Sequence, residues 1–174
     1  MTQKIINDSA TTVVKLLKKK AMSISVAESI TGGGVGQALT SVPGSSEVFL
    51  GGVIAYSDKL KMDLLGVERK IIKKFSPCSE EVALQMATGV QLLTGSDFAI
   101  ATTGVAGPGK AYDQKAGSVW IAIAGSKKSK ITPFAFYLQL SASAPGLSTA
   151  ARRDEIRNAT ITSALAAFER ILLS

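Results

Sequence analysis

Histidine is absent from this sequence of 174 residues, and cysteine occurs once. The absence of histidine excludes a Ser-His-Asp triad, a Cys-His dyad and the common histidine-based zinc and iron sites. A single cysteine excludes an intramolecular disulfide, a CxxC redox motif and a thiolate zinc site. Any chemistry must therefore come from hydroxyl, amine, carboxylate or guanidinium groups, from Cys78 or from backbone amides.

Long apolar runs and aromatic residues are also scarce. No stretch approaches the ~18 apolar residues that span a membrane, and the lysines near the N-terminus follow the apolar residues, unlike in a secretory signal. We therefore expect a cytoplasmic protein with no membrane partner. The net charge is +7, but only 6% of residues are aromatic and the basic groups do not alternate with them. Nucleic acid is therefore not an expected partner.

The hydrophobic pattern alternates between helices and strands along one domain, residues 1–174. Helices are predicted at 3–20, 34–42, 58–65, 79–94 and 152–172, and strands at 23–27, 49–56, 97–103, 117–124 and 131–140. This order predicts an α/β fold, a three-layer α/β/α sandwich with a mixed central sheet. Ligands bind at the C-terminal ends of such strands, so we expect a site in the loops at 29–34, 57–61 and 104–116.

Two glycine-rich segments resemble nucleotide-binding motifs only in part. Residues 104–110 fit G-x-x-x-x-G-K, but Ala111 follows where a P-loop needs Ser or Thr, and no helix is predicted next. Residues 32–36 lack the third glycine of G-x-G-x-x-G. A glycine-rich loop, with or without a pocket, is the simpler interpretation of residues 104–110.

Three polar segments can still carry chemistry. In residues 27–33, Ser29 and Thr31 come just before a glycine-rich helix start, whose amides could hold an oxyanion or phosphate, although Thr31 is equally explained as an N-cap. Residues 43–46 form a tight turn that ends in two serines. In residues 56–61, Tyr56 ends a strand and Lys61 follows about one helical turn after it.

A serine nucleophile needs a base, and lysine is the natural candidate where histidine is missing. The three segments therefore favour Ser–Lys acyl transfer, with Tyr56 available to relay a proton or to orient the amine of Lys61. A surface lysine on an amphipathic helix remains the simpler explanation of Lys61. Spacing alone does not say which serine reacts.

These segments occur in the order found in one family. They are AESITGG (27–33), PGSS (43–46), GGVIAYS (51–57) with Lys61, LGV (65–67) and TGVAGP (103–108). The sequence resembles the CinA C-terminal domain family over about residues 5–172. Stand-alone members of that family are nicotinamide mononucleotide deamidases, and the length of this chain fits the stand-alone form.

The resemblance implies hydrolysis of the carboxamide of nicotinamide mononucleotide to nicotinic acid mononucleotide and ammonia, without metal or cofactor. It implies Ser46 as the nucleophile, Lys61 as its base and Tyr56 beside them. Ser29 is the alternative nucleophile. A homodimer or higher homo-oligomer is expected.

The resemblance also implies a set of substrate-binding residues. Arg153, in the late Arg-x-x-Ile-Arg segment, is the candidate for the 5′-phosphate. The other expected substrate contacts are Ser29, Thr31, Gly32, Gly33, Thr103 and Gly104.

This sequence departs from the family pattern at Ile30, at Arg152 and through residues 109–117. The altered loop at 109–116 is the best support for an alternative function, that of a non-catalytic module that binds nucleotides or a protein partner in competence.

Overall fold

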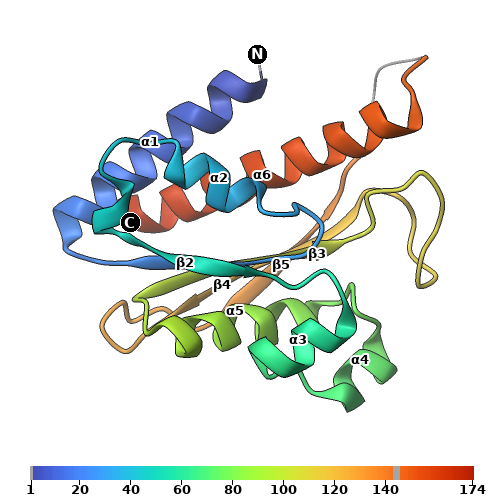
Figure 1. The fold of residues 1–174 in the computed structure, drawn as a ribbon, viewed down its shortest axis with the longest axis horizontal. Coiled ribbons are helices and arrows are strands. Elements are labelled where there is room, and N and C mark those ends of the chain that lie inside the picture. The colour runs from blue at the N-terminus through green and yellow to red at the C-terminus, as the bar shows by residue number, and fades with distance from the viewer. Residues whose placement is uncertain (1, 143–145) are drawn as a thin grey trace.

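The computed structural model describes residues 2–142 and 146–174, which fold into three layers (Figure 1). The helices are α1 (Thr2–Lys20), α2 (Gly34–Thr40), α3 (Asp58–Leu65), α4 (Arg69–Phe75), α5 (Glu80–Thr94) and α6 (Thr149–Leu173), with a short 3-10 turn η1 (Ser45–Glu47). The strands are β1 (Ile24–Glu28), β2 (Phe49–Ile54), β3 (Phe98–Gly104), β4 (Ser118–Gly125) and β5 (Phe134–Gln139). The predicted α/β/α sandwich is confirmed.

The sheet is mixed, as predicted, and has the strand order β2-β1-β3-β4-β5. β1 runs parallel to both β2 and β3, whereas β4 is antiparallel to β3 and to β5. The chain leaves β1 through α2 to reach β2 on one side, then returns through α3, α4 and α5 to β3 on the other side. The order therefore reverses at β1, and such a reversal opens a crevice at the C-terminal strand ends.

The two faces of the sheet are packed differently. α1, α2 and α6 cover one face and α3, α4 and α5 cover the other (Figure 1). Large side chains fill the first face, where the rings of Phe98 and Phe168 lie 5.1 Å apart. The core under α5 is rich in alanine; its members include Ala83, Ala87, Ala99, Ala101 and Ala122. Small side chains allow α5 to lie close to the strands.

α3 and α5 also touch through their backbones. A Cβ atom at Gly89 of α5 would lie 1.9 Å from the carbonyl oxygen of Leu65, the last residue of α3. The boundaries of α3 are those predicted from the sequence. The Ser57 hydroxyl accepts from the Leu60 N–H at 3.2 Å, and Gly66 closes the helix with φ 67°.

One helix was not predicted. α4 (Arg69–Phe75) has only seven residues, so its three apolar side chains, Ile71, Ile72 and Phe75, form too short a pattern to indicate a helix. The segment between the strand predicted at 131–140 and the helix predicted at 152–172 lies partly outside the described residues, because residues 143–145 are not described. Within the described ranges, no helix has the length and apolar character to cross a membrane.

Candidate active site

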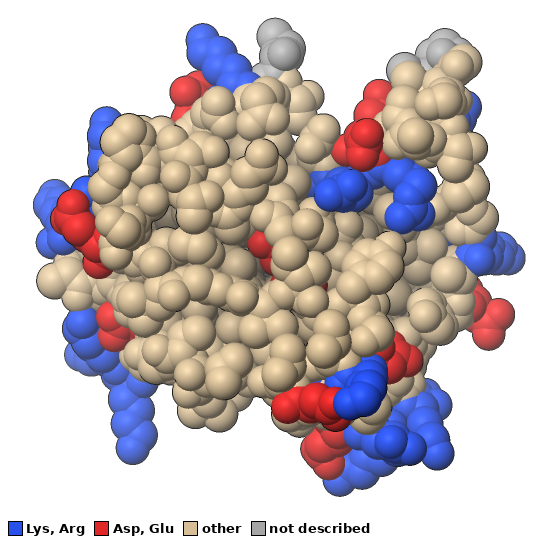
Figure 2. Space-filling view, viewed as in Figure 1, with Lys and Arg blue, Asp and Glu red and all other residues tan. Residues whose placement is uncertain are grey.

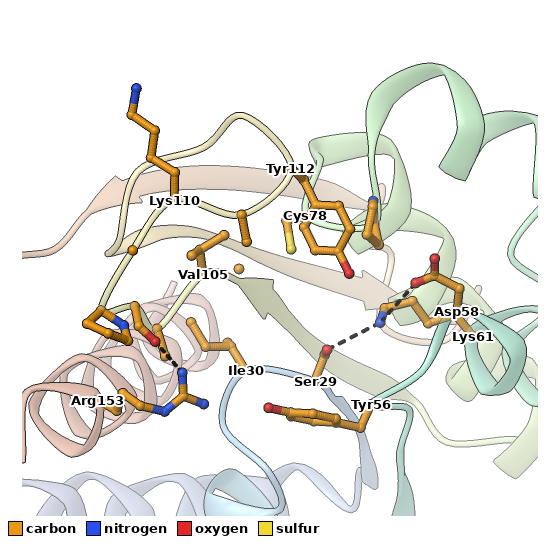
Figure 3. Close-up of a pocket in the computed structure, with 17 residues that line it drawn as sticks. Ser29, Ile30, Tyr56, Asp58, Lys61, Cys78, Val105, Lys110, Tyr112 and Arg153 are labelled. Atoms are coloured by element: carbon orange, nitrogen blue, oxygen red, sulfur yellow. Dashed lines mark hydrogen bonds and ion pairs between the residues drawn. The ribbon is translucent and has the colours of Figure 1, made fainter. Parts of the chain in front are cut away.

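A pocket of about 380 Å³ opens at the C-terminal ends of β1, β2 and β3, where the sequence predicted a site (Figure 3). Ser29 follows β1, Tyr56 follows β2, and residues 104–112 follow β3 and form one wall. The charged side chains come from α3 (Asp58 and Lys61), from α6 (Arg153) and from the loop after β3 (Lys110). The lining includes Ser29, Ile30, Tyr56, Asp58, Lys61, Cys78, Arg153 and residues 104–112.

A buried lysine–serine pair lies in this pocket. The Lys61 Nζ donates a hydrogen bond to the Ser29 Oγ at 3.3 Å. Only 2% of Lys61 and 8% of Ser29 are exposed, so both polar groups are largely removed from water. Figure 3 shows the Lys61 amine between the Ser29 hydroxyl and the Asp58 carboxylate, whose Oδ1 lies 4.0 Å from Nζ.

The environment of Lys61 favours its neutral form. Burial lowers the pKa of the amine below its ordinary value near 10.5, and attraction to Asp58 and Cys78 offsets only part of this effect. Asp58 is partly exposed, with 44% of its side chain accessible, so water screens its charge. Burial also raises the pKa of the neighbouring Cys78 thiol, although the thiol has the Thr103 hydroxyl and Lys61 nearby. At a given pH, a larger fraction of Lys61 than of a surface lysine is therefore unprotonated and available to act as a base.

The position of Ser29 is fixed on both sides. Its backbone N–H donates to the Thr102 carbonyl of β3 at 2.9 Å. The preceding residue, Glu28, is 1% exposed, and its carboxylate accepts from the backbone N–H groups of Gly33, Val35 and Gly36 at 2.7 to 3.0 Å. The residue before the serine therefore caps α2 and holds the turn that follows the serine.

Ser46 does not lie in this pocket, and its expected contact with Lys61 is wrong for this fold. Ser46 is exposed in η1, before β2 begins, whereas Tyr56 and Lys61 follow the end of β2. The length of β2 separates these ends by about 20 Å. The neighbour of Ser46, Glu47, pairs with Lys18 at the end of α1, at 2.8 Å. Ser29 instead occupies the place beside Lys61.

Four other expected substrate contacts also lie outside the pocket. The Thr31 hydroxyl is fully buried against the Thr102 hydroxyl at 2.7 Å, and the Thr103 hydroxyl donates to the Pro77 carbonyl at 2.8 Å. The Gly32 N–H donates to the Ser29 carbonyl, and the Gly33 N–H donates to Glu28. The helix start that was expected to bind an anion is thus occupied by Glu28.

The remaining expected residues line the pocket together: Ser29, Tyr56, Lys61, Gly104 and Arg153. Arg153 lies at the far end from Lys61, and its Nη1 donates to the Gly107 carbonyl (Figure 3). The second arginine of the same segment, Arg157, donates from Nη2 to the Thr31 carbonyl at 3.1 Å. α6 therefore contacts both the pocket wall and the turn after Ser29.

Three pocket residues, Asp58, Cys78 and Tyr112, were not predicted individually, although Asp58 and Tyr112 lie in loops where a site was expected. Asp58 had a detectable signal, because it lies three residues before Lys61 on the same face of a predicted helix. Cys78 precedes α5, and nothing local to it indicates that its thiol faces Lys61. Tyr112 lies on the glycine-rich loop and depends on the course of that loop.

The fold and this site define a three-layer α/β/α protein with a buried serine–lysine pair at the reversal point of a mixed sheet. Residues 6–172 match the model of the CinA C-terminal domain. The chain therefore belongs to the CinA C-terminal domain family, and the resemblance noted in its sequence is confirmed.

Solved structures agree with this assignment. The competence/damage inducible protein CihA of Agrobacterium tumefaciens superposes with a TM-score of 0.85 and 30% identity, covering 96% of this chain and 95% of that one. The CinA superfamily protein KP700603 of Klebsiella pneumoniae superposes with a TM-score of 0.86 and 26% identity, covering 97% and 98%.

Among curated relatives, a CinA-like protein of Gloeothece citriformis is 53% identical over 109 residues, which are 62% of this chain and 26% of the relative. A putative competence-damage inducible protein of Desulforudis audaxviator is 44% identical over 119 residues, 68% of this chain and 29% of the relative. The matched part thus spans less than a third of these curated relatives.

Proposed function

We propose that this protein hydrolyses the carboxamide of nicotinamide mononucleotide to nicotinic acid mononucleotide and ammonia, a step in pyridine nucleotide recycling. Membership of the CinA C-terminal domain family supports the substrate. The hydrogen bond between the Lys61 amine and the Ser29 hydroxyl carries the mechanism, because it joins a nucleophile to a base inside a pocket. This hydrogen bond supports Ser29, in place of Ser46, as the proposed nucleophile.

In the first half of the reaction, neutral Lys61 takes the proton of the Ser29 hydroxyl as Oγ attacks the carboxamide carbon. The carbonyl oxygen becomes an oxyanion. The backbone N–H that follows the nucleophile serves as an oxyanion donor in many serine hydrolases. Here that group belongs to Ile30, which lines the pocket and has no acceptor within residues 2–142 and 146–174. We assign it this role.

Collapse of the tetrahedral intermediate breaks the C–N bond. The Lys61 ammonium gives its proton to the departing nitrogen, so ammonia leaves and an ester to Ser29 remains. Lys61 is then neutral again and deprotonates a water molecule that attacks the ester. The products are the free acid and the restored hydroxyl. Tyr56, which lines the pocket beside Ser29, is retained as the group that relays a proton or orients the amine.

Arg153 is suited to the other end of the substrate. One of its nitrogens is bound to the Gly107 carbonyl, which leaves further N–H groups of the guanidinium for phosphate oxygens. Its location at the far end of the pocket from Lys61 allows the 5′-phosphate and the carboxamide of one molecule to be held together (Figure 3).

The chain provides a matched pair of serines for the test. We expect Ser29→Ala to reduce ammonia release from nicotinamide mononucleotide by a factor of about a thousand or more, because it removes the nucleophile. Ser46→Ala should keep the wild-type rate, since Ser46 is exposed beyond the other end of β2. Ammonia release is measured for both purified variants and for the wild type.

Loss of activity in Ser46→Ala with activity retained in Ser29→Ala would overturn the assignment of the nucleophile. A wild-type protein that binds the mononucleotide without releasing ammonia would overturn the proposed activity and favour the non-catalytic binding module.

A further inference from the structure

The glycine-rich wall of the pocket ends in a tight hairpin turn. Ala111 and Gln114 exchange backbone hydrogen bonds at 3.1 and 2.9 Å. The two central residues, Tyr112 and Asp113, both have positive φ, 52° and 59°. Positive φ at both central positions is characteristic of a type I′ turn. Tyr112 is thus held in a conformation that a bulky side chain seldom adopts.

Gln114 ties this turn to residues 76–78, which lead into α5. Its Nε2 donates to the Cys78 carbonyl at 2.7 Å and to the Ser76 hydroxyl at 3.2 Å. Residues 76–78 are also bound to β3, because the Pro77 carbonyl accepts a hydrogen bond from the Thr103 hydroxyl. The turn is therefore anchored directly to the residues that lead into α5.

This anchoring places the Tyr112 ring over the reactive pair. Figure 3 shows the Tyr112 hydroxyl directed toward Ser29 and Lys61, with the Tyr56 ring on the other side of Ser29. Tyr112 is 58% exposed and Tyr56 65%. Within the part of the chain that the structure describes, neither ring stacks on another aromatic ring. Two exposed phenol rings therefore border the nucleophile from two sides.

We propose that Tyr112 and Tyr56, here called the tyrosine clamp, contact a flat heteroaromatic ring from two sides and present its carboxamide carbon to Ser29. Tyr112 is thus a specificity residue, and Gln114 is a positioning residue that acts through it. This inference rests on the proposed function and specifies which carboxamides the site accepts. Aromatic faces attract flat rings with little regard to ring substituents, so the clamp selects planar substrates over aliphatic amides.

The test measures binding separately from catalysis. In a Ser29→Ala background, calorimetry gives the dissociation constants of nicotinamide mononucleotide and of ribose 5-phosphate, which lacks the ring. We expect Tyr112→Ala to weaken mononucleotide binding about tenfold, in the range of one lost stacking contact. Binding of ribose 5-phosphate should not change. Tyr112→Phe should restore most of the mononucleotide affinity, because it keeps the ring.

Asp113→Asn is the matched control. Asp113 occupies the same turn, is exposed and does not line the pocket, and asparagine tolerates positive φ. We expect Asp113→Asn to bind nicotinamide mononucleotide with the same dissociation constant as the protein without this substitution. Gln114→Ala should weaken mononucleotide binding in the same direction as Tyr112→Ala, and it should have no added effect when Tyr112 is already alanine.

The outcomes separate the two proposals. Equal weakening of both ligands by Tyr112→Ala, or no weakening of either, would overturn the clamp and leave the hydrolysis proposal standing. Ring-dependent binding without ammonia release from the protein that retains Ser29 would overturn the proposed hydrolysis and leave the clamp standing. Absence of any mononucleotide binding would overturn both.

Discussion

Lys61 is a basic side chain in a place that disfavours positive charge. The alanine-rich core lies behind it, and its nearest carboxylate, Asp58, is 4.0 Å away and partly exposed. Desolvation is the largest influence on its pKa and acts against protonation. The same burial that prepares the amine to act as a base should therefore reduce the stability of the fold.

This trade-off gives a prediction at the residue scale. We expect Lys61→Met to abolish ammonia release and to raise the free energy of unfolding at pH 7, because methionine fills a similar volume without charge. The folded pKa of Lys61 lies below its unfolded value, so between the two the unfolded chain binds more protons and wild-type stability rises with pH. The advantage of the variant should shrink as pH approaches about 10.5.

Urea unfolding at several pH values between 7 and 10 measures this difference. Lys59→Met on the same helix is the control, since the Lys59 side chain is 79% exposed. The change in the free energy of unfolding caused by Lys59→Met should be the same at the lower pH values of this range. A Lys61→Met protein less stable than the wild type at pH 7 would refute the argument.

At the scale of elements, α2 depends on a residue outside itself. Its amides at Gly33, Val35 and Gly36 are satisfied by the Glu28 carboxylate at the end of β1. Gly33, the N-cap residue of α2, makes no side-chain hydrogen bond that could take the place of the Glu28 carboxylate. A buried carboxylate that accepts several N–H groups stabilises the start of a helix through both hydrogen bonds and the helix dipole.

We therefore predict that Glu28→Gln destabilises the protein by about 1–3 kcal/mol, because the amide NH₂ cannot accept from a backbone N–H. Chemical denaturation provides the measurement. The control, Glu47→Gln, removes only an exposed ion pair with Lys18 and should cost less than about 1 kcal/mol. Similar effects of the two substitutions would contradict the capping role.

The contrast between α3 and α4 shows what the sequence could predict about elements. α3 has local signals at both ends, Ser57 and Gly66, and was predicted with the correct boundaries. α4 has only seven residues and packs on the core through partly buried Ile71 and Ile72, so its apolar pattern is too short for periodicity to reveal it.

Ser46 shows the corresponding limit for the site. Its turn was recognised correctly, yet β2 carries the chain from one end of the sheet to the other between Ser46 and Lys61. Spacing along a sequence does not show at which end of a strand a residue lies. The pairing of Ser29 with Lys61 is long-range and depends on the sheet order.

At the scale of the whole molecule, the outer edge of β2 is an exposed apolar surface that no other described strand pairs with. β2 is an end strand of the sheet, and its Leu50 and Ile54 are 51% and 53% exposed. Figure 2 shows charged side chains mainly at the margins of the face that carries α2 and β2, with few at its centre. Exposed apolar edge strands favour pairing with another chain. We propose that a second copy of this chain covers this edge.

The corresponding prediction concerns assembly. We expect the wild type to sediment as a homodimer or higher homo-oligomer, and Leu50→Lys to shift it toward monomer, because a lysine on an edge strand opposes pairing. Leu92→Lys, at a position 72% exposed on α5, is the control and should leave the assembly unchanged. Sedimentation equilibrium distinguishes the cases, and a monomeric wild type would disprove the proposal.

The backbone contact between Gly89 and Leu65 has a consequence for anyone who tries to alter this protein. α3 carries Lys61, and Gly89 sets how closely α3 approaches α5, so the spacing of the base from Ser29 depends on a residue that no substrate touches. Directed evolution confined to the pocket lining would leave this position unsampled. Residues at the contact between α3 and α5 should therefore be varied together with the pocket lining when a new activity is sought.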